Sequence, residues 1–383
     1  SNMWKIRKTY KYRLYPTKNQ IVILDKQLAL CCELYNAALQ ERRDAWKMAR
    51  KSIDFRSQSD QLPQIKADRL DVNGVYSQVL QDVLHRVDKT FQSFFRRVRR
   101  KETPGFPRFR SRAWYDSFTY PQLGFAIKDA RLNLSKIGSI KIKLHRPVDG
   151  KIKTLTIKRA AGKWYACFSV EMENVPFSPS SKSIGIDIGL THFATLSDGR
   201  EIDNPRFYRI AQAALRIAQR KIARRKRDSR RRRKAIRLLQ RTHVHIGCQR
   251  SNFHHQVSRA LVNAYGFIAV EDLNVKGLTK GMLAKSVSDA GWSSFIAKLA
   301  YKAENAGRML IKVDPRGTSQ TCICGASVPK TLGQRWHKCL DCGLSLGRDH
   351  VAAKNILGLG LSLQESRAMA PFLEKPSALA VGS

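Results

Sequence analysis

Acidic residues are scarce in this chain. Aspartate and glutamate together number 30 among 383 residues, against 71 lysines and arginines, so the formal net charge is +41. A surface this one-sided repels itself unless a polyanion neutralises it. The charge therefore predicts a nucleic-acid partner. A merely solvated basic surface and a membrane surface are the alternatives that charge alone leaves open.

Long hydrophobic runs are also missing. No apolar run approaches the roughly 20 residues that a helix needs to cross a bilayer. The N-terminal stretch is basic and alternating, unlike a secretory signal, and Ser1-Asn2-Met3 resembles a tag remnant before a natural start at Met3. No internal repeat is visible. A chain of this length holds two or three domains, and we expect a cytoplasmic protein without a membrane partner.

The eight cysteines fall into two groups. One group is clustered, as Cys322-Ile323-Cys324 and Cys339-Leu340-Asp341-Cys342. The other group is scattered through apolar or mixed segments, where we expect buried, reduced thiols. Its members are Cys31, Cys32, Cys167 and Cys248. Clustered pairs in a reducing compartment bind metal more often than they cross-link.

The clustered pairs predict a structural zinc site. Gly325 and Gly343 each follow the second cysteine of a pair, where glycine permits a tight turn that points backbone amides at sulfur. The second pair has the C-x2-C spacing, and the first is one residue shorter. The predicted ligands of Zn²⁺ are Cys322, Cys324, Cys339 and Cys342. His337 is a substitute ligand, and a ribbon that no longer binds metal is the alternative.

Hydrophobic periodicity divides the first half of the chain. Residues 4–15 alternate between an apolar face that includes Trp4 and a basic face, which predicts a half-buried strand. Residues 18–50 and 76–99 have helical spacing, and residues 132–172 return to alternation. This order predicts one barrel interrupted by a helical insertion. The Pro- and Ser-rich residues 174–182 predict a domain boundary.

The second half alternates strands with helices. Its predicted strands and helices, in order, are a buried strand at 183–190, short strands at 192–196 and 200–202, helix over 208–264, a strand at 267–270, a helix at 288–306, a strand at 309–311 and a helix at 349–358. Beyond Leu361 we expect a loose tail. This order is typical of a ribonuclease-H-like domain.

Three carboxylates stand at informative places in that order. Asp187 lies inside an apolar strand, where a lone charge costs several kcal/mol unless it is paired or binds metal. Glu271 ends a second strand, and Asp349 opens a helix. Mg²⁺ prefers such hard oxygen ligands, and two ions about 4 Å apart can hydrolyse a phosphodiester. We therefore predict that Asp187, Glu271 and Asp349 hold two catalytic Mg²⁺ ions.

Neighbouring polar residues compete for the same role. Asp272 follows Glu271 directly, but successive side chains of a strand point in opposite directions, which argues against it. Asp341 belongs with the cysteines. Asn355 could lie near the carboxylates, and the sequence leaves its role open. Taken singly, Glu271 and Asp349 could each be a helix cap or a surface ion pair.

Basic residues concentrate in two segments. A loop at residues 105–110 interleaves arginine with phenylalanine, which can meet phosphates and stack on bases. Residues 220–237 are dense in arginine and lysine, and such a run favours contact with a phosphate backbone over a solvated helix face. The predicted nucleic-acid contacts are Arg108, Arg110, Arg224, Arg225, Arg227, Arg231 and Arg232.

A set of short motifs runs through nearly the whole chain. They are Tyr12-Arg13-Leu14-Tyr15-Pro16, Gly105-Phe106-Pro107-Arg108-Phe109, Gly185-Ile186-Asp187-Ile188-Gly189, Val270-Glu271-Asp272-Leu273, Ser288-Asp289-Ala290-Gly291-Trp292, Ser319-Gln320-Thr321-Cys322, and Arg348-Asp349 through Asn355-Ile356. With these motifs in this order, the chain resembles the TnpB family, transposon-encoded relatives of type V CRISPR effectors. The short C-x-C pair and Gly347, where many relatives carry an acid, depart from the family pattern.

The resemblance implies an α+β multidomain fold: a wedge β-barrel with an inserted helical recognition lobe, then a RuvC-like (ribonuclease-H-like) nuclease with a zinc-ribbon insertion. The implied boundaries are 3–17 and 121–178 for the wedge barrel, 18–120 for the recognition lobe, 179–316 and 347–362 for the nuclease, 317–346 for the ribbon and 363–383 for a flexible tail. By position, Asp187, Glu271 and Asp349 are the RuvC carboxylates and the clustered cysteines are the ribbon ligands.

The function implied is that of an RNA-guided DNA endonuclease. Its partners would be a guide RNA derived from the transposon end and double-stranded target DNA, cut beside a short transposon-associated motif. Base pairing between the guide RNA and the target would explain why the chain carries much positive charge for binding a phosphate backbone and few features for reading bases. The alternatives are a guided repressor that does not cut, a conventional transposase, and a nonenzymatic RNA-binding accessory protein. The oligomeric state stays open.

Overall fold

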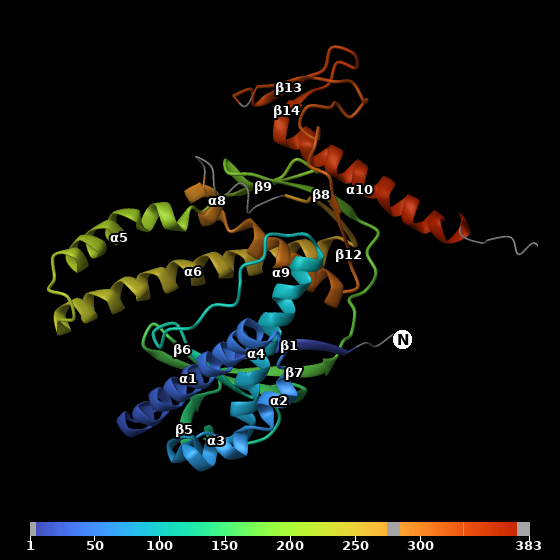
Figure 1. The fold of residues 1–383 in the computed structure, drawn as a ribbon. Coiled ribbons are helices and arrows are strands. Elements are labelled where there is room, and N and C mark those ends of the chain that lie inside the picture. The colour runs from blue at the N-terminus through green and yellow to red at the C-terminus, as the bar shows by residue number, and fades with distance from the viewer. Residues whose placement is uncertain (1–4, 274–283, 332, 374–383) are drawn as a thin grey trace, which may run out of the picture. The chain divides into compact units, whose positions relative to one another are not determined.

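The computed structural model describes residues 5–273, 284–331 and 333–373 (Figure 1). Trp4, with the predicted strand and barrel residues before Lys5, and residues 374–383 of the predicted tail lie outside these ranges. The chain divides into two compact units, Ser1–Asn174 and Val175–Ser383. The division falls at the start of the Pro- and Ser-rich segment that predicted a boundary.

The first unit is built around one antiparallel sheet of seven strands. The strands are β1 (Lys5–Tyr15), β2 (Ser117–Tyr120), β3 (Phe125–Lys128), β4 (Arg131–Leu134), β5 (Gly138–Lys143), β6 (Lys151–Ala160) and β7 (Lys163–Glu173), in the order β2-β6-β7-β1-β5-β4-β3. Strand β1 precedes the helices of this unit, yet it lies between β7 and β5. The prediction of one sheet interrupted by a helical insertion is therefore confirmed.

The sheet curls into a nearly closed barrel. Its two edge strands, β2 and β3, approach each other, with the rings of Tyr120 and Phe125 6.3 Å apart. Phe125 also lies 6.3 Å from Phe168 of the central strand β7. Alternate residues of β1, including Tyr12 and Leu14, are fully buried in this interior, as expected for a strand with one face toward the core.

Helices occupy most of the insertion. They are α1 (Lys18–Ala49), α2 (Phe55–Ser59), α3 (Leu62–Asp68), a 3₁₀ turn (Leu70–Gly74) and α4 (Ser77–Arg99). Thr17 caps α1 reciprocally with Gln20, directly after the strand-ending Pro16. The predicted helical lobe at 18–120 differs from the structure at its end, because β2 already pairs with β6. A strand of four residues is too short to reveal its alternation.

The second unit contains a five-stranded sheet. Its strands are β8 (Ser183–Ile188), β9 (His192–Leu196), β10 (Glu201–Asp203), β11 (Phe267–Glu271) and β12 (Met309–Val313), in the order β10-β9-β8-β11-β12. Strands β8, β11 and β12 run parallel, β9 is antiparallel to its neighbour β8, and the edge strand β10 is antiparallel to β9. A short hairpin, β13 (Trp336–Lys338) with β14 (Ser345–Gly347), stands apart from this sheet.

Helices cover both faces of the five-stranded sheet. They are α5 (Phe207–Ala223), α6 (Arg230–Ala264), α8 (Ala284–Ala290), α9 (Trp292–Asn305) and α10 (Arg348–Leu373). Residues of α6, α8 and α9 share one buried core with β8, β9 and β11. Helix α10 packs on the opposite face, where a second core joins it to β11 and β12 (Figure 1).

Helix α10 is longer than the sequence suggested. It continues to Leu373, although we expected a loose tail beyond Leu361 and a flexible segment from residue 363. Residues 363–370 lack proline and glycine and include good helix formers such as leucine, glutamate, arginine and alanine, so the helix has no local reason to stop there. Of the helices that the structure describes, none combines the length and apolarity needed to cross a membrane.

Candidate active site

Asp187 faces the α10 side of the sheet. Along β8, Ile184, Ile186 and Ile188 are buried in the core shared with α6 and α9. Because side chains of a strand alternate between its faces, Gly185 and Asp187 project the other way. Asp187 is half-buried, so this side chain is neither fully sealed in the core nor freely solvated.

Gly185 brings α10 into direct contact with this strand. A Cβ atom at Gly185 would lie 2.2 Å from the backbone oxygen of Ala353 and 2.7 Å from the backbone nitrogen of Leu357. Ala352 and Ala353 are both buried. These small residues let the helix pack close to the sheet, and Asp349 lies one turn before Ala353 on the same helix.

Glu271 projects from the same face of the sheet as Asp187. In β11, Phe267 and Ala269 belong to the core beneath α10, whereas Ile268 and Val270 belong to the opposite core. Alternation therefore places Glu271 on the α10 side. Strands β8 and β11 are parallel neighbours with Val270 opposite Ile186, which brings the ends of the two strands, and with them Glu271 and Asp187, to the same edge.

Asp272 lies outside this arrangement, as the alternation predicted. Its carboxylate is 3.4 Å from the Lys312 ammonium, and both side chains are at least half exposed. The Asp272 backbone N–H donates to the carbonyl oxygen of Val313. Two adjacent acids of the same segment thus have different environments, one facing α10 and one paired on the surface.

The electrostatics of the carboxylates show that they are close enough to interact. Burial raises the pKa of Asp187 to about 8, and repulsion from Glu271 and Asp349 adds to the rise, while the Arg348 guanidinium opposes it. Burial also raises the pKa of Glu271. Burial and the neighbouring acids thus disfavour the ionised form of Asp187 despite the nearby Arg348, and a metal ion between the acids would favour that form.

Thr318 is a residue of this site that the sequence reasoning missed. Its hydroxyl donates to Oε1 of Glu271 at 2.5 Å, which lowers the pKa of that carboxyl. Thr318 directly precedes the motif that begins at Ser319, but neither its residue type nor its distance in sequence from the other motifs indicates that it belongs to the site. Asn355, left open by the sequence, donates to the backbone oxygens of Thr318 and Thr321 at 2.8 and 2.7 Å. Asn355 thus holds the loop that contains Thr318 to α10.

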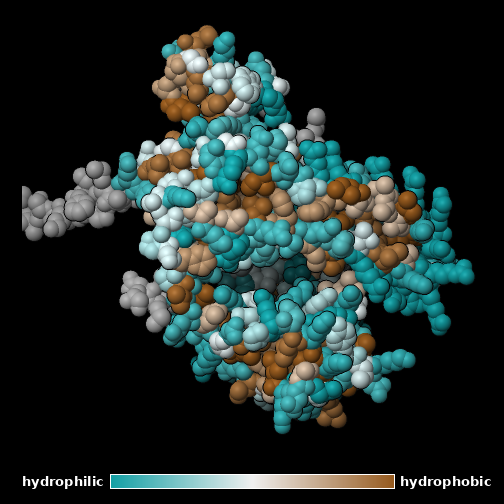
Figure 2. Space-filling model, turned by 180° about the vertical axis from the view of Figure 1, so that it is seen from behind, coloured by the Kyte–Doolittle hydropathy of each residue, from teal (hydrophilic) through white to brown (hydrophobic). Residues whose placement is uncertain are grey.

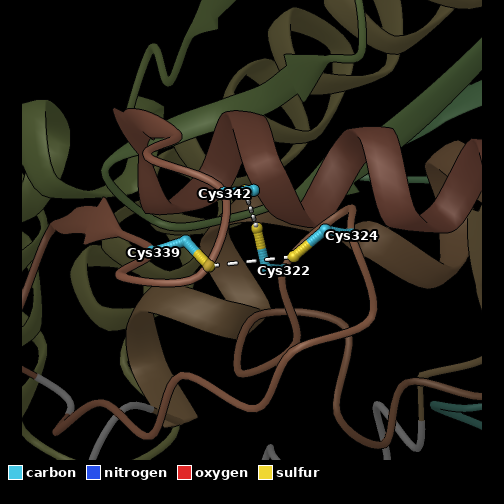
Figure 3. A group of neighbouring side chains, drawn as sticks. All are labelled: Cys322, Cys324, Cys339 and Cys342. Carbon is cyan, nitrogen blue, oxygen red and sulfur yellow. Dashed lines mark hydrogen bonds between the residues drawn. The ribbon is translucent and has the colours of Figure 1, made fainter.

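The four clustered cysteines meet, as their spacing predicted (Figure 3). Their sulfur atoms all lie within 4.8 Å of one another, with Cys322 and Cys342 3.6 Å apart and Cys324 and Cys339 3.8 Å apart. Bonds of about 2.3 Å from a tetrahedral zinc ion would put the sulfurs about 3.8 Å apart. The one-residue spacing of the first pair therefore does not keep Cys324 from the group.

Backbone amides stabilise the thiolate form of one member of this group, Cys339, whereas the pKa values of Cys322 and Cys342 are raised. Hydrogen bonds from the backbone of Cys342 and Asp341 lower the pKa of Cys339 to about 7. Gly325 and Gly343 have φ of 92° and 72°, the left-handed region in which glycine is favoured. Within the described ranges, these cysteines form the one set of three or more Cys, His, Asp or Glu side chains that is compact enough to share a single ion.

His337 does not belong to the cysteine group. Its side chain is fully buried on β13, and neither ring nitrogen has a hydrogen-bond partner. Burial lowers its pKa, with a further contribution from Lys330, so the ring is neutral. Of the scattered cysteines, Cys31 and Cys32 are buried as predicted, but Cys167 on β7 is only half-buried and Cys248 is exposed on α6.

The arginine-rich run forms the tip of a helical hairpin. Helix α5 ends at Ala223 and α6 begins at Arg230, with Ser229 as its N-cap, so the helical sequence predicted over 208–264 forms two helices. The hydrophilic surface of this hairpin projects at the right of Figure 2. Exposed members of the predicted set are Arg224, Arg225, Arg227 and Arg231. Arg232 is half-buried and directs its guanidinium to the backbone oxygens of Ile222 and Arg225.

The predicted basic loop at residues 105–110 is an extended segment without helix or strand. Arg108 and Arg110 are exposed, and Asn36 of α1 bonds to both backbone groups of Arg110. The ring of Phe106 packs edge-on against Phe91 and Phe94 of α4. The loop is thus anchored to helices, while its arginine side chains remain available.

Comparisons with known families define the class of protein. A family model described as "Probable transposase" matches residues 167–282, and one described as "Cas12f1-like, TNB domain" matches residues 292–356. A third, described as "Helix-turn-helix domain", matches residues 3–51. In the described part of that range, residues 5–51, the structure has the strand β1 and the helix α1.

Comparisons with single proteins extend over the whole chain. A "Putative RNA-guided DNA endonuclease" of Streptomyces pristinaespiralis is 33% identical over 94% of this chain and 91% of the relative. A protein of the same description, InsQ of Escherichia coli K12, is 29% identical over 92% of each chain. The chain belongs to the TnpB family, and the resemblance seen in its motifs is confirmed.

Solved structures share the fold at low sequence identity. The chain of a Cas12f1–sgRNA–target DNA complex superposes with a TM-score of 0.60 and 14% identity, covering 92% of this chain and 98% of that one. A mini-RNA-guided endonuclease, Cas_phi3, gives a TM-score of 0.51 and 10% identity, covering 93% and 92%. These effectors therefore have the same overall fold as this chain.

Proposed function

We propose that this protein is an RNA-guided DNA endonuclease that cleaves double-stranded DNA beside a short transposon-associated motif, by two-metal-ion phosphodiester hydrolysis in a RuvC-like site. Its partners would be a guide RNA from the transposon end and the target duplex. The family membership supports the general activity, because relatives that align over nearly the whole chain carry that description.

The observation that carries the cleavage mechanism is the shared face of three acids. Asp187 and Glu271 leave neighbouring parallel strands toward α10, and Asp349 lies in the first turn of α10. The sheet order β10-β9-β8-β11-β12, with antiparallel strands on one side and parallel strands on the other, is the order of a ribonuclease-H-like domain. This agreement supports the assignment of a RuvC-like nuclease.

The three acids fit divalent ions by their chemistry. Carboxylate oxygens are the hard ligands that Mg²⁺ prefers, and burial together with the two neighbouring acids raises the pKa of Asp187, so a cation there would favour its ionised form. Two Mg²⁺ ions held there would activate water and stabilise the leaving oxygen. The protein's own contribution is to keep the acids on one rigid face, with Glu271 oriented by Thr318 and the Arg348 charge near Asp187.

The cysteine group fits a structural zinc ion. Four sulfurs at tetrahedral spacing would satisfy all four positions of Zn²⁺, so the site would be closed and would take no part in the chemistry. The ion would hold together a loop and a small hairpin that share few buried side chains of their own. In this role the segment is the zinc ribbon of the nuclease.

The domain boundaries implied by the resemblance form part of the proposal. Residues 3–17 and 121–178 would form the wedge barrel, 18–120 the recognition lobe, 179–316 and 347–362 the nuclease, and 317–346 the ribbon. The first of the two compact units would then hold the wedge and recognition parts, and the second would hold the nuclease. Helix α10, which continues past residue 362, supports a longer final nuclease segment.

The net charge of +41 supports a protein that grips nucleic acid by its backbone. Sequence choice would then come from base pairing with the guide. Exposed arginines at the α5–α6 tip and in the loop at residues 105–110 are the contacts we propose for this purpose. Neutralising them should weaken binding uniformly across sequences and reduce its dependence on salt.

The proposal is tested by purifying the protein with the RNA that copurifies from its native locus. That RNA is sequenced, and the complex is mixed with Mg²⁺ and a plasmid library that carries the matched target beside random flanks. We expect one discrete RNA and cleavage beside a fixed short motif. Guide-dependent binding without cleavage would instead indicate a repressor, and heterogeneous RNA without cleavage would indicate a nonenzymatic RNA-binding protein.

A further inference from the structure

Thr318 lies where three parts of the second unit meet. It follows β12 in the loop that leads to Cys322, and only 5% of it is exposed. Its hydroxyl reaches Glu271 on β11, and its backbone oxygen accepts a hydrogen bond from Asn355 on α10. One residue thus connects the cysteine ribbon, the strand that carries Glu271 and the helix that carries Asp349.

The hydrogen bond from Thr318 distinguishes the two oxygens of Glu271. The hydroxyl lies 2.5 Å from Oε1 and 3.1 Å from the backbone oxygen of Pro315, so the contact with Oε1 is the shorter and stronger of its two hydrogen bonds. The other carboxylate oxygen, Oε2, is left for a metal ion. A long, flexible side chain is thereby held in one orientation before an ion arrives, which removes part of the entropy that binding would otherwise cost.

The loop around Thr318 is itself held to α10 and to the ribbon. Asn355 bridges the backbone oxygens of Thr318 and Thr321, which is the residue before Cys322. Ser319 accepts a hydrogen bond from Arg348 at its hydroxyl, at 3.2 Å, and one from Lys330 at its backbone oxygen, at 2.6 Å. The position of Thr318 therefore depends on the same loop that delivers the first cysteine to its group.

We propose that Thr318 is a positioning residue that orients Glu271, and that the cysteine site controls this orientation through the loop from Thr318 to Cys322. The inference rests on the proposed function, in which Glu271 is a ligand of a divalent ion. Partners that orient metal ligands commonly contribute a factor of about 10 to 100 in affinity. The ribbon would then have a second role besides its own stability: it would set the affinity of the carboxylate site for its metal.

The first test compares Thr318→Val with Thr318→Ser in the full-length chain. Valine keeps the shape of threonine and removes the hydroxyl, whereas serine keeps the hydroxyl and removes a methyl group. Manganese binding to the RNA-free protein is measured by calorimetry, with Asp187→Ala as the baseline for ions bound elsewhere. We expect Thr318→Val to weaken binding about tenfold and Thr318→Ser to stay within about threefold of the parent.

Cleavage kinetics provide an independent readout of the same variants. With guide RNA and target present, Thr318→Val should need about tenfold more Mg²⁺ for half-maximal cleavage, with most of the rate recovered at saturating Mg²⁺. Affinity for guide and target should not change. Equal loss in Thr318→Val and Thr318→Ser would assign Thr318 to packing alone and overturn the proposal, as would binding in Thr318→Val that equals the parent.

The second test addresses the link to the cysteines. Cys342→Ser is made in the parent and in the Thr318→Val background, and manganese affinity is measured for all four proteins. We expect Cys342→Ser to weaken binding about tenfold in the parent and to add little once the hydroxyl is gone. If the losses of manganese affinity caused by Cys342→Ser and by Thr318→Val multiply in the double variant, the cysteine site does not act through Thr318.

The proposed function and the positioning role of Thr318 are contradicted by different results. If the parent and Asp187→Ala bind manganese alike, the carboxylates hold no ion, and the proposed function and the positioning role fall together. If the parent binds manganese through Asp187 and Thr318→Val binds equally well, only the positioning role falls. A melting temperature within a few degrees of the parent establishes that each variant is folded before its affinity is interpreted.

Discussion

The cysteine group and the carboxylate group of the second unit are assembled in contrasting ways. All four cysteines come from a segment of 21 residues, Cys322 to Cys342, and two tight turns bring their sulfurs within 4.8 Å of one another. The acids at 187, 271 and 349 are far apart in sequence, and two parallel strands and one helix bring them to a common face. One site is local and closed, and the other depends on the whole sheet.

This difference in assembly distinguishes a site suited to stabilising the fold from a site suited to catalysis. A closed set of four soft ligands leaves no position for substrate, which suits a structural ion. Carboxylates on a half-buried face would leave coordination positions of their ions open for water and phosphate, and burial together with the two neighbouring acids raises the pKa of Asp187 before an ion binds. The ligands of the local site all come from one short segment, whereas the open site requires the sheet and α10 to be packed together.

The largest effect is expected from removing one acid of the open site. Glu271→Ala should reduce cleavage by about a thousandfold or more, because it removes metal-dependent stabilisation worth several kcal/mol. Guide and target affinity should be retained. The rate is measured by single-turnover cleavage of a matched target with Mg²⁺.

The matched control for this loss is Asp272→Ala. Asp272 is adjacent in sequence but pairs with Lys312 on the surface, so its variant should cleave within about twofold of the parent, since a surface pair is worth at most about 1 kcal/mol. A similar loss in both variants would mean that the two faces of β11 have been assigned incorrectly. Asp187→Ala and Asp349→Ala should behave like Glu271→Ala.

A closed site should lose its ion when one buried ligand changes. Cys322→Ser should reduce bound zinc from about one ion per chain to well below one, because the four sulfurs satisfy a single tetrahedral ion. Its melting temperature should fall, because ribbon folding and metal binding are linked. Metal content is measured by mass spectrometry after dialysis. Cys248→Ser, at an exposed and isolated thiol on α6, is the control and should match the parent in both measurements.

The open site should also be sensitive to the distance between β8 and α10. Gly185→Ala places a methyl group 2.2 Å from the Ala353 backbone oxygen, so helix and strand must separate, at a cost of about 3 kcal/mol. Denaturant unfolding measures the change. Gly358→Ala, on the exposed side of the same helix with open space around it, should instead stabilise by up to about 1 kcal/mol. Equal effects would contradict the close packing at Gly185.

A smaller effect concerns the charge of Asp187 without metal. Its pKa is raised from 3.8 to about 8, so between these values the folded state keeps a proton that the unfolded chain has released. This contribution to stability therefore falls as the pH rises through that window. Asp187→Asn should exceed the metal-free parent in stability at pH 8, by on the order of 2 kcal/mol, and the two should converge near pH 4.

Thermal unfolding in a chelator measures this difference across the pH range. Saturating Mg²⁺ should raise the melting temperature of the parent more at pH 8 than at pH 5, since the ion binds the ionised form. Asp272→Asn should follow the parent throughout. A metal-free parent that gains stability relative to Asp187→Asn as the pH rises would contradict the environment described for Asp187.

Patterns close in sequence were the most predictable. The spacing of the cysteines and the position of Gly325 and Gly343 indicated a compact group, because turn geometry is decided by a few neighbouring residues. The alternation in β1 likewise predicted its buried face. The short strands β2 and β3 were missed, since four residues carry too little alternation to be distinguished from a loop.

Contacts between distant segments were less predictable. The sequence indicated which acids should meet, but not that Thr318 would donate to Glu271 or that Asn355 would hold the ribbon loop. A threonine or an asparagine fits many environments, and only the packing of α10 against the sheet selects this one. The end of α10 was also missed, because helix formers in a terminal segment resemble a solvated tail.

The most direct test of the open site is to locate its metal ions. Crystals or frozen complexes of the full-length protein with guide RNA and target, prepared with Mn²⁺, would be examined for metal between Asp187, Glu271 and Asp349. The account predicts anomalous manganese signal at these three acids and zinc signal at the four cysteines. Zinc at the cysteines with no manganese at the acids, in a complex that still cleaves its target, would contradict it.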